Sequence, residues 1–520
     1  MRLGFVIDHS RCIGCHACSV ACKEENQVPL GVYRTWVKYI EKGTFPDVRR
    51  HFAVLRCNHC DDAPCVTICP TEALLRADNG IVDFDNEQCI GCKACMQACP
   101  YDALYIDPAT HTAAKCNFCA HRVEVGLKPS CEVVCPEQAI LSGDLDDPGS
   151  RISQFINRET VSVRKPEQGT RPKLYYKEVD EHSIDPASSS RGDGYLFAEE
   201  RSGFGRDWLL SLLGNGGKPA DPGLWRDAEE RARTTYDVVH HRPWGGKVSA
   251  YIFTKSIAAG APLCAAVALG TGRAALGDVM LDAGLILCLV FLAITSVLLV
   301  ADLKRPERFW KILFRPQWRS WLAIGAYVLA AFGVIAAATL GARWLDLVPL
   351  ERFLWLLLAP AAVMAAIYTG FLFSQAEGRD FWQDPALPVH LLIHALAAGS
   401  ASLLIAGEIA GDGVSSGVFE LQWTILAGSL LLSLFVVVCS QHWMRHGTKD
   451  AVQSARWLTR GPGRRGYWFG VVLLGHLAPL VLLFAGTGGV ATSGAALLAL
   501  LGLLWYEHLW VLAGQSQPLS

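Results

Sequence analysis

The stretch Cys12-Ile-Gly-Cys-His-Ala-Cys-Ser-Val-Ala-Cys22 holds four cysteines, and the same spacing returns at residues 89–99. Of the nineteen cysteines in this 520-residue chain, sixteen lie between residues 12 and 135. They form four groups: Cys12, Cys15, Cys18, Cys22; Cys57, Cys60, Cys65, Cys69; Cys89, Cys92, Cys95, Cys99; and Cys116, Cys119, Cys131, Cys135. Three cysteines separated by two residues each can hold a [4Fe–4S] cluster, while the fourth of such a run ligates the other cluster of a two-cluster unit. The spacing therefore predicts iron–sulfur clusters.

Disulfides and zinc are the alternatives for so many cysteines. Residues 1–10 carry no secretory signal, and the regular spacing is not that of a disulfide scaffold. Structural zinc is bound by two pairs of ligands, whereas two of the groups here contain three cysteines at a regular interval. The pattern favours iron and sulfur over both alternatives.

Short strands and turns surround these groups. We expect strands at 3–7, 32–39, 52–55 and 103–106, and a hairpin of 73–76 with 81–84 around Asn79-Gly80. The first and third groups form an internal repeat. The first half of the chain is therefore predicted to be an α+β, duplicated ferredoxin-like domain held together largely by its metal clusters.

This part resembles the four-cluster iron–sulfur subunit of the dimethyl sulfoxide reductase, polysulfide reductase and formate dehydrogenase family. The resemblance covers about residues 3–180, including all four groups in order and the segment 169–176. It implies four [4Fe–4S] clusters and a separate molybdenum or tungsten bis-pterin catalytic subunit as partner. It also implies four ligand sets: Cys12, Cys15, Cys18 with Cys135; Cys116, Cys119, Cys131 with Cys22; Cys57, Cys60, Cys65 with Cys99; and Cys89, Cys92, Cys95 with Cys69.

The second half of the chain is apolar. Eight segments are long enough to cross a membrane, near 250–270, 280–301, 320–340, 353–373, 388–409, 419–439, 467–487 and 490–513. We therefore expect three parts: a cluster domain at 1–184, a polar linker or docking segment at 185–248, and an all-α, eight-helix membrane anchor at 249–515. Trp208–Leu213, inside the linker, is a short apolar patch with helical spacing. The formal net charge of −2 gives no sign of a nucleic-acid partner.

The membrane half resembles the quinone-reactive anchors of polysulfide reductase and nitrite reductase. The match lies in residues 302–310, Ser320-Trp321, 325–327 and Trp382-Gln383 with the prolines that follow. Anchors of this family have eight spans and no haem, and they exchange electrons with a quinone. The resemblance therefore implies a multi-pass protein that contacts lipid and quinone.

Quinone chemistry needs protonatable groups at membrane depth, and ionisable residues inside spans are functional candidates because they are costly there. Lys255 and Tyr251 lie one turn apart on one face of the first span, and Asp302 and Arg305 lie at the end of the second. We expect these four to serve the quinone or its protons. The alternative is that Lys255 snorkels to the interface and that Asp302 and Arg305 form only a surface salt bridge.

Histidines in the later spans raise the question of haem. His390 and His394 are four residues apart, and His476 and His508 lie in other spans. Paired histidines can ligate haem b, but the anchor resemblance implies none, and histidines in spans commonly form hydrogen bonds between helices. Cys264, Cys288 and Cys439 are expected to be buried small residues.

Basic residues cluster in the loops after the second and sixth spans, on the same side as the amino terminus. We expect a bacterial inner-membrane protein, and the positive-inside rule then predicts that its cluster domain lies in the cytoplasm. The alternative is that these loops dock partners on the outer face. The whole pattern favours an electron-transfer subunit between quinone and a catalytic partner. A hydrogenase partner, an ion or proton translocator using Lys255, Asp282, Glu408 and Glu507, and a redox sensor are its rivals.

Overall fold

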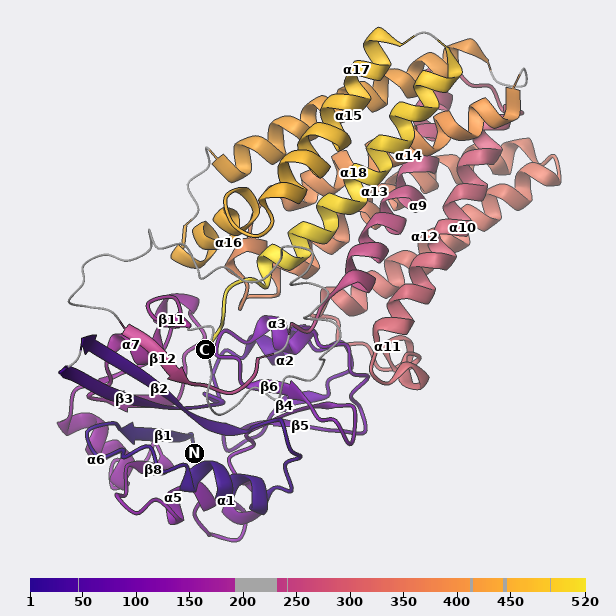
Figure 1. Ribbon diagram of the computed structural model, residues 1–520. Coiled ribbons are helices and arrows are strands. Elements are labelled where there is room, and N and C mark those ends of the chain that lie inside the picture. Colours follow the sequence, from indigo (N-terminus) through magenta and orange to yellow (C-terminus); the bar gives the residue numbers. More distant parts are fainter. Residues whose placement is uncertain (45, 192–231, 241, 412–414, 443–446, 487) are drawn as a thin grey trace. The chain divides into compact units, whose positions relative to one another are not determined.

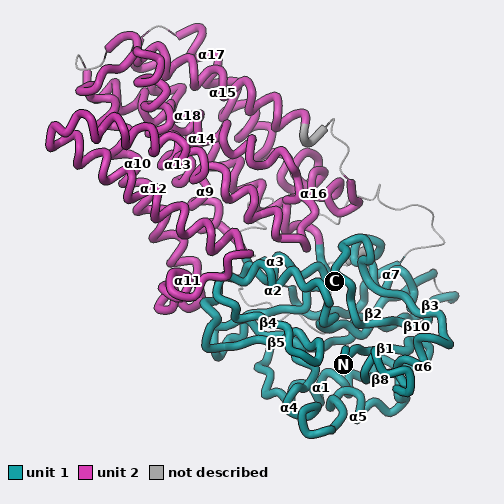
Figure 2. The backbone as a smooth tube through the Cα atoms, turned by 180° about the vertical axis from the view of Figure 1, so that it is seen from behind, with its two compact units in different colours: residues 1–243, 518–520 teal, residues 244–517 magenta. Residues whose placement is uncertain are grey.

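The computed structural model describes residues 1–44, 46–191, 232–240, 242–411, 415–442, 447–486 and 488–520. It divides into two compact units, coloured separately in Figure 2. Unit 1 contains Met1–Pro243 and Pro518–Ser520, and unit 2 contains Trp244–Gln517. Figure 1 shows unit 1 as short strands with short helices, and unit 2 as long helices. The apolar patch predicted at Trp208–Leu213 lies outside the described residues.

The first sheet of unit 1 has the order β8-β1-β10-β9. Its strands are β1 (Leu3–Asp8), β8 (Ile140–Asp144), β9 (Val161–Ser162) and β10 (Leu174–Lys177). β1 is buried along its whole length and pairs in parallel with β10 and antiparallel with β8. Helix α6 (Arg151–Arg158) packs Ile152 against Val6 and Leu141. The predicted opening strand is confirmed.

The second sheet has the order β11-β12-β2-β3. β2 (Thr35–Thr44) and β3 (Asp47–Arg56) form a longer hairpin than the predicted 32–39 and 52–55, because the pairing continues through polar residues that show no hydrophobic alternation. β11 (Ser190–Arg191) and β12 (Ala232–Tyr236) come from the segment predicted as a linker. β12 pairs antiparallel with β2, so unit 1 extends beyond residue 184.

Two small hairpins complete unit 1. β4 (Leu74–Arg76) pairs with β5 (Val82–Phe84), which confirms the hairpin predicted around Asn79-Gly80. Gly80 has a φ of +77°, a conformation that glycine adopts without strain. β6 (Leu104–Ile106) pairs with β7 (Ala113–Lys115). The short helices between the strands are α1 (Ala17–Glu25), α2 (Pro64–Ile68), α3 (Ala94–Ala98), α4 (Ala120–Val123), α5 (Ser130–Val133) and α7 (Glu181–Ile184).

Unit 2 contains, among the described residues, eight helices long and apolar enough to cross a membrane, as predicted. They are α9 (Gly246–Gly270), α10 (Val279–Asp302), α12 (Trp321–Trp344), α13 (Val348–Ser374), α14 (Leu387–Ala410), α15 (Ser416–His442), the π-helix η7 (Gly466–Leu477) continued by α17 (Ala478–Ala485), and α18 (Gly489–Gly514). Short α11 (Lys311–Phe314) and α16 (Lys449–Thr459) lie in the connections.

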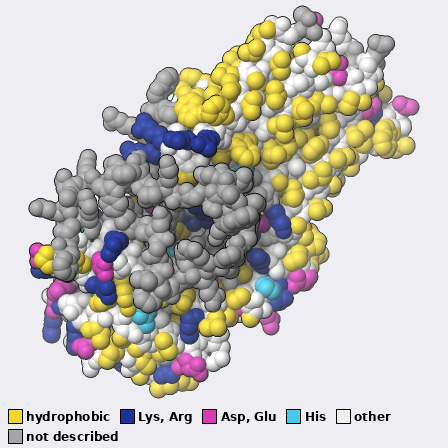
Figure 3. Space-filling view, in the orientation of Figure 1, with side chains coloured by type: hydrophobic (Ala, Val, Ile, Leu, Met, Phe, Trp, Pro, Cys, Tyr) yellow, Lys and Arg dark blue, Asp and Glu magenta, His cyan; other side chains and the backbone are white. Residues whose placement is uncertain are grey.

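Helices α9 and α14 form the centre of unit 2, and both are mostly buried. They approach closely where two glycines meet: a Cβ atom added to Gly399 would lie 2.1 Å from the carbonyl carbon of Gly260. Small residues allow such backbone contact between membrane helices. The outer helices expose large apolar side chains such as Leu356 and Phe435, and Figure 3 shows hydrophobic side chains over most of the visible face of this unit. This surface is suited to lipid.

Candidate functional site

The four cysteine groups share one backbone feature. The residue before the second cysteine has a positive φ in every group: +70° at Gly14, +44° at His59, +69° at Gly91 and +63° at Phe118. Such a left-handed residue turns the chain sharply, so that the first two cysteines of a group can face the same centre. The conformation is uncommon for residues other than glycine, and its repetition at His59 and Phe118 indicates that the surrounding structure imposes it.

Each of four cavities in unit 1 is lined by four of these cysteines. The sets are Cys22, Cys116, Cys119, Cys131; Cys69, Cys89, Cys92, Cys95; Cys12, Cys15, Cys18, Cys135; and Cys57, Cys60, Cys65, Cys99. Their empty volumes are about 260, 380, 370 and 310 Å³, respectively. In every cavity three cysteines come from one group and the fourth from another. The structure thus brings together the same four sets that the family resemblance implied.

Local structure explains the exchange of the fourth cysteine. In the first group Cys18 and Cys22 lie four residues apart on α1, so their Cα atoms are separated by about 6 Å along the helix axis. Cys18 lines the cavity of its own group, while Cys22 lines the cavity of the fourth group. One short helix therefore supplies cysteines to two cavities.

Backbone amides donate hydrogen bonds to several of the sulfur atoms. The amides of Gly91 and Ala113 donate to Cys89 Sγ at 3.4 and 3.3 Å, and the Ala139 amide donates to Cys135 Sγ at 3.3 Å. Hydrogen bonds to sulfur are a normal feature of cluster sites, where they stabilise negative charge on the ligands.

The protein environment alone disfavours thiolates. Burial raises the pKa of the Cys65 and Cys95 thiols well above the ordinary value. Iron would offset this cost, because a coordinating thiol is deprotonated by its metal. Among the described residues no three His, Cys, Asp or Glu side chains are arranged to hold a single metal ion. Four cysteines around each cavity suit a polynuclear cluster better than one zinc ion.

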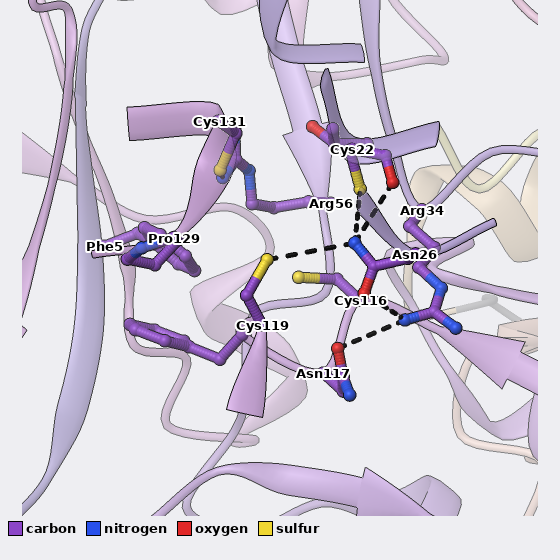
Figure 4. A pocket seen from close by; sticks show the side chains of 12 residues that line it. Phe5, Cys22, Asn26, Arg34, Arg56, Cys116, Asn117, Cys119, Pro129 and Cys131 are labelled. Carbon is purple, nitrogen blue, oxygen red and sulfur yellow. Dashed lines mark hydrogen bonds between the residues drawn. The ribbon is translucent and has the colours of Figure 1, made fainter. Parts of the chain in front are cut away.

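Asn26 and two arginines add polar groups to one cavity, shown in Figure 4. Asn26 Nδ2 is 3.7 Å from Cys22 Sγ and 3.8 Å from Cys119 Sγ. Arg34 Nη1 donates to Asn26 Oδ1 at 2.9 Å, which orients this amide. Arg56 Nη1 donates to Cys131 Sγ at 3.0 Å. These side chains could not be placed from the sequence, because each reaches the cavity from a different element.

In unit 2, Lys255 and Tyr251 are both buried on α9. Lys255 Nζ donates to the carbonyl oxygen of Ala366 on α13 at 2.6 Å and lies 5.2 Å from the centre of the Tyr368 ring. With 1% of its surface exposed, Lys255 does not snorkel to the interface. Tyr368 was not singled out from the sequence, since its proximity to Lys255 depends on the packing of α13 against α9.

Asp302 and Arg305 are less enclosed than Lys255. Asp302 ends α10, and Arg305 follows it just outside the helix, with Nη1 at 3.3 Å from Glu307 Oε1. These two residues therefore lie near the helix end, as the sequence suggested, while Lys255 and Tyr251 lie inside the helical unit.

Three of the histidines in the spans form hydrogen bonds between helices. His394 Nδ1 lies 2.9 Å from Glu507 Oε1 on α18, His476 Nε2 lies 3.0 Å from Ser433 Oγ on α15, and His508 Nδ1 lies 3.3 Å from Ser249 Oγ on α9. The ring centres of His390 and His394 are 4.2 Å apart. Cys264 and Cys288 are fully buried, and Cys439 is partly exposed.

Two comparisons identify the halves of the chain. Residues 48–145 match a family model described as a 4Fe-4S dicluster domain. A tetrathionate reductase subunit of Salmonella typhimurium is 43% identical over 189 residues, covering 36% of this chain and 76% of that protein. Protein NrfC of Escherichia coli is 47% identical over 178 residues, which cover 34% of this chain and 80% of that protein. A polysulfide reductase chain of Wolinella succinogenes is 41% identical over 179 residues, which cover 34% of this chain and 93% of that protein.

The membrane half matches a second family model. Residues 234–518, more than half of the chain, match the model described as polysulphide reductase, NrfD. This range contains all eight spanning helices. The chain therefore belongs to the polysulphide reductase NrfD family, with an iron–sulfur electron-transfer domain joined to the multi-pass membrane domain.

Proposed function

We propose that this chain carries electrons between a quinone in the membrane and a separate catalytic subunit, through four [4Fe–4S] clusters. The observation that carries the proposal is the set of four separate cavities, each lined by four cysteines. When bound, such clusters accept and release single electrons. The chain supplies the thiolate ligands, the amide donors that face them and the apolar packing that limits access of water.

The quinone side of the proposal rests on buried polar groups in unit 2. Quinone reduction consumes two electrons and two protons, so the site needs groups that hold and move protons. Lys255 and Tyr251, the Tyr368 ring beside Lys255, and the pair of His394 with Glu507 are candidates. His394 Nε2 is buried and has no hydrogen-bond partner among the described residues. A quinone oxygen or a water molecule would satisfy this nitrogen. Asp302 and Arg305 would act at the helix end, on the path of protons.

The partner is proposed by analogy with the relatives. Their names are those of components of tetrathionate reductase, polysulfide reductase and arsenate respiratory reductase. We propose a molybdenum or tungsten bis-pterin enzyme as the catalytic subunit. We propose the bacterial inner membrane as the location of this chain, and the positive-inside rule supports a cytoplasmic cluster domain. This orientation favours electron flow into the quinone pool.

A translocator relay of Lys255, Asp282, Glu408 and Glu507 is less well supported. Asp282 is bound by the guanidinium of Arg343, whose Nη1 also lies 3.4 Å from Glu351 Oε1. A carboxylate held in such an ion pair is poorly suited to release and accept protons. A hydrogenase partner would leave the electron-transfer role unchanged.

Purification of the native complex from its membrane through this chain tests the proposal. We expect a co-purifying large subunit, molybdenum or tungsten, and about sixteen irons per chain, as four cubanes require. Nickel with a hydrogenase pair would change the partner but keep the electron-transfer role. Iron without any catalytic subunit would contradict the proposal and favour a sensor or translocator.

A further inference from the structure

Arg56 is a fully buried cation at the edge of a cysteine-lined cavity. It is the last residue of β3, with 0% of its surface exposed. Its Nη1 donates to Cys131 Sγ at 3.0 Å, and its guanidinium lies 4.8 Å from the centre of the Phe5 ring. Figure 4 shows the guanidinium beside the Cys131 sulfur. Both Arg56 and Phe5 line the cavity of Cys22, Cys116, Cys119 and Cys131.

A buried guanidinium needs a compensating negative charge, because removal of an ion from water is costly. In the part of the chain that the structure describes, no carboxylate lies within ion-pair distance of Arg56, and its Nε and Nη2 atoms are buried without hydrogen-bond partners. Glu132, which follows Cys131, is bonded instead to Lys128 Nζ at 2.5 Å and to the Ser142 amide at 3.0 Å. The contact of Arg56 with Cys131 Sγ makes this cysteine, as a thiolate ligand of a bound cluster, the source of the compensating charge.

We propose that Arg56 raises the reduction potential of the cluster bound by Cys22, Cys116, Cys119 and Cys131. Its positive charge favours the reduced form of this cluster. The inference rests on the proposed occupancy of the cavities. With clusters bound, one electron would pass from a neighbouring cluster to this one, with no bond made or broken and no proton taken up. The electron adds one negative charge to a group that is already negative, and the fixed positive charge of Arg56 stabilises this reduced form.

The effect should be largest at one cluster. Cys131 receives the hydrogen bond, and Arg56 lines the cavity of Cys22, Cys116, Cys119 and Cys131 but none of the other three cysteine-lined cavities. The low dielectric of the interior keeps the charge from being screened by solvent. We therefore expect the reduction potential to shift most at the cluster of Cys131.

Redox titration of the complex monitored by electron paramagnetic resonance tests this inference in the variants Arg56→Gln and Arg56→Lys. The control is Arg50→Gln, on the same strand, because Arg50 is exposed and its Nη2 pairs with Glu41 at 2.6 Å. In Arg56→Gln we expect full iron content and one midpoint potential lower by about 59 mV or more, the equivalent of a tenfold loss in the equilibrium constant for one electron. In Arg56→Lys the midpoint potential should stay close to that of the unmodified protein, and in Arg50→Gln it should be unchanged.

Full iron with unchanged midpoints in Arg56→Gln would overturn the inference. If that variant loses iron, Arg56→Lys decides. Full iron with a midpoint within about 59 mV of the parent supports a charge effect. Loss of iron in Arg56→Lys as well, or a larger fall in its midpoint, would show that the shape of the guanidinium matters and not its charge. Iron well below about sixteen per chain in the unmodified complex would count against the proposed function itself.

Discussion

His394 on α14 and Glu507 on α18 form a buried hydrogen-bonded pair, with 2.9 Å between Nδ1 and Oε1. Only 2% and 3% of their side chains are exposed. Polar and ionisable groups at this depth are expensive, and hydrogen bonding offsets only part of that cost. The rings of His390 and Tyr506 pack against His394, so the pair belongs to a cluster of polar and aromatic side chains inside the helical unit.

Neutralising this pair should impair quinone chemistry without loss of clusters. We expect Glu507→Gln to lower the rate of cluster reduction by a quinol at least about tenfold, since a positioned proton acceptor typically contributes that much or more. Iron content and reduction by dithionite should be unchanged. Glu408→Gln, which removes an exposed carboxylate from α14, is the control. Equal quinol rates in the two variants would exclude a role for Glu507 in proton transfer.

Lys255 offers a way to separate function from stability. Lys255→Met removes the desolvation cost of a buried polar group, so the variant should be as stable as the parent or more stable. Electron exchange with quinone should nevertheless fall. Lys247→Met, at the exposed start of α9 where Nζ donates to the Ala301 carbonyl oxygen, is the control. Thermal unfolding and quinol-linked rates are measured together. A destabilised variant with a normal rate would assign Lys255 a structural role.

The exchange of cysteines between groups predicts which cluster each substitution removes. Cys99→Ser should abolish the cluster of Cys57, Cys60 and Cys65, and spare the cluster of its own sequence group. Cys69→Ser should have the converse effect. Paramagnetic resonance spectra of the reduced proteins distinguish the two outcomes, and the buried membrane residue Cys288, changed to serine, should leave iron unchanged. Loss of the cluster of Cys89, Cys92 and Cys95 in Cys99→Ser would refute the pairing.

His240 should make the stability of unit 1 depend on pH. Burial disfavours its charged form, but hydrogen bonds and charges from Asp102 and Asp237 outweigh this and raise the pKa of His240 to about 9. The stabilisation is fully present below the unfolded pKa of about 6.5 and is lost as pH rises toward 9. Its upper limit is about 3 kcal/mol. Thermal loss of the iron–sulfur absorption should therefore shift to lower temperature over this range, and His240→Gln should flatten the shift. If the unmodified protein and His240→Gln show the same change in this temperature with pH, His240 is not the group responsible.

The close contact of α9 with α14 predicts sensitivity to one added methyl group. A Cβ atom at Gly399 would lie 2.1 Å from Gly260, so Gly399→Ala must separate the helices. We expect a destabilisation of about 1–3 kcal/mol or more, as in other overpacked cores. A Cβ atom at Gly341 on α12 would meet nothing within 4 Å, and Gly341→Ala is the control. The melting temperatures of the two variants are measured in detergent. Similar values would show that α9 and α14 can move apart to accept the methyl group without loss of stability.

Local sequence determined the chemical class of each half of this protein. Cysteine spacing, Gly14 and Gly91, and the Asn79-Gly80 turn each act within a few residues, so the cluster loops and the β4–β5 hairpin could be predicted. The eight spans could be predicted because a membrane requires long apolar runs. The four cysteine sets came from family resemblance and not from spacing, since nothing local connects Cys22 with Cys116.

Tertiary structure decided the contacts between segments far apart in the chain. Three contacts join residues separated by 75 positions or more: the pairing of β12 with β2, the hydrogen bond from Arg56 to Cys131, and the hydrogen bond between His394 and Glu507. Such contacts leave no periodic signal, because each depends on how whole elements pack. The sequence thus specified which chemistry the chain can support, and packing specified which charged groups act on the clusters and which lie together inside the helical unit.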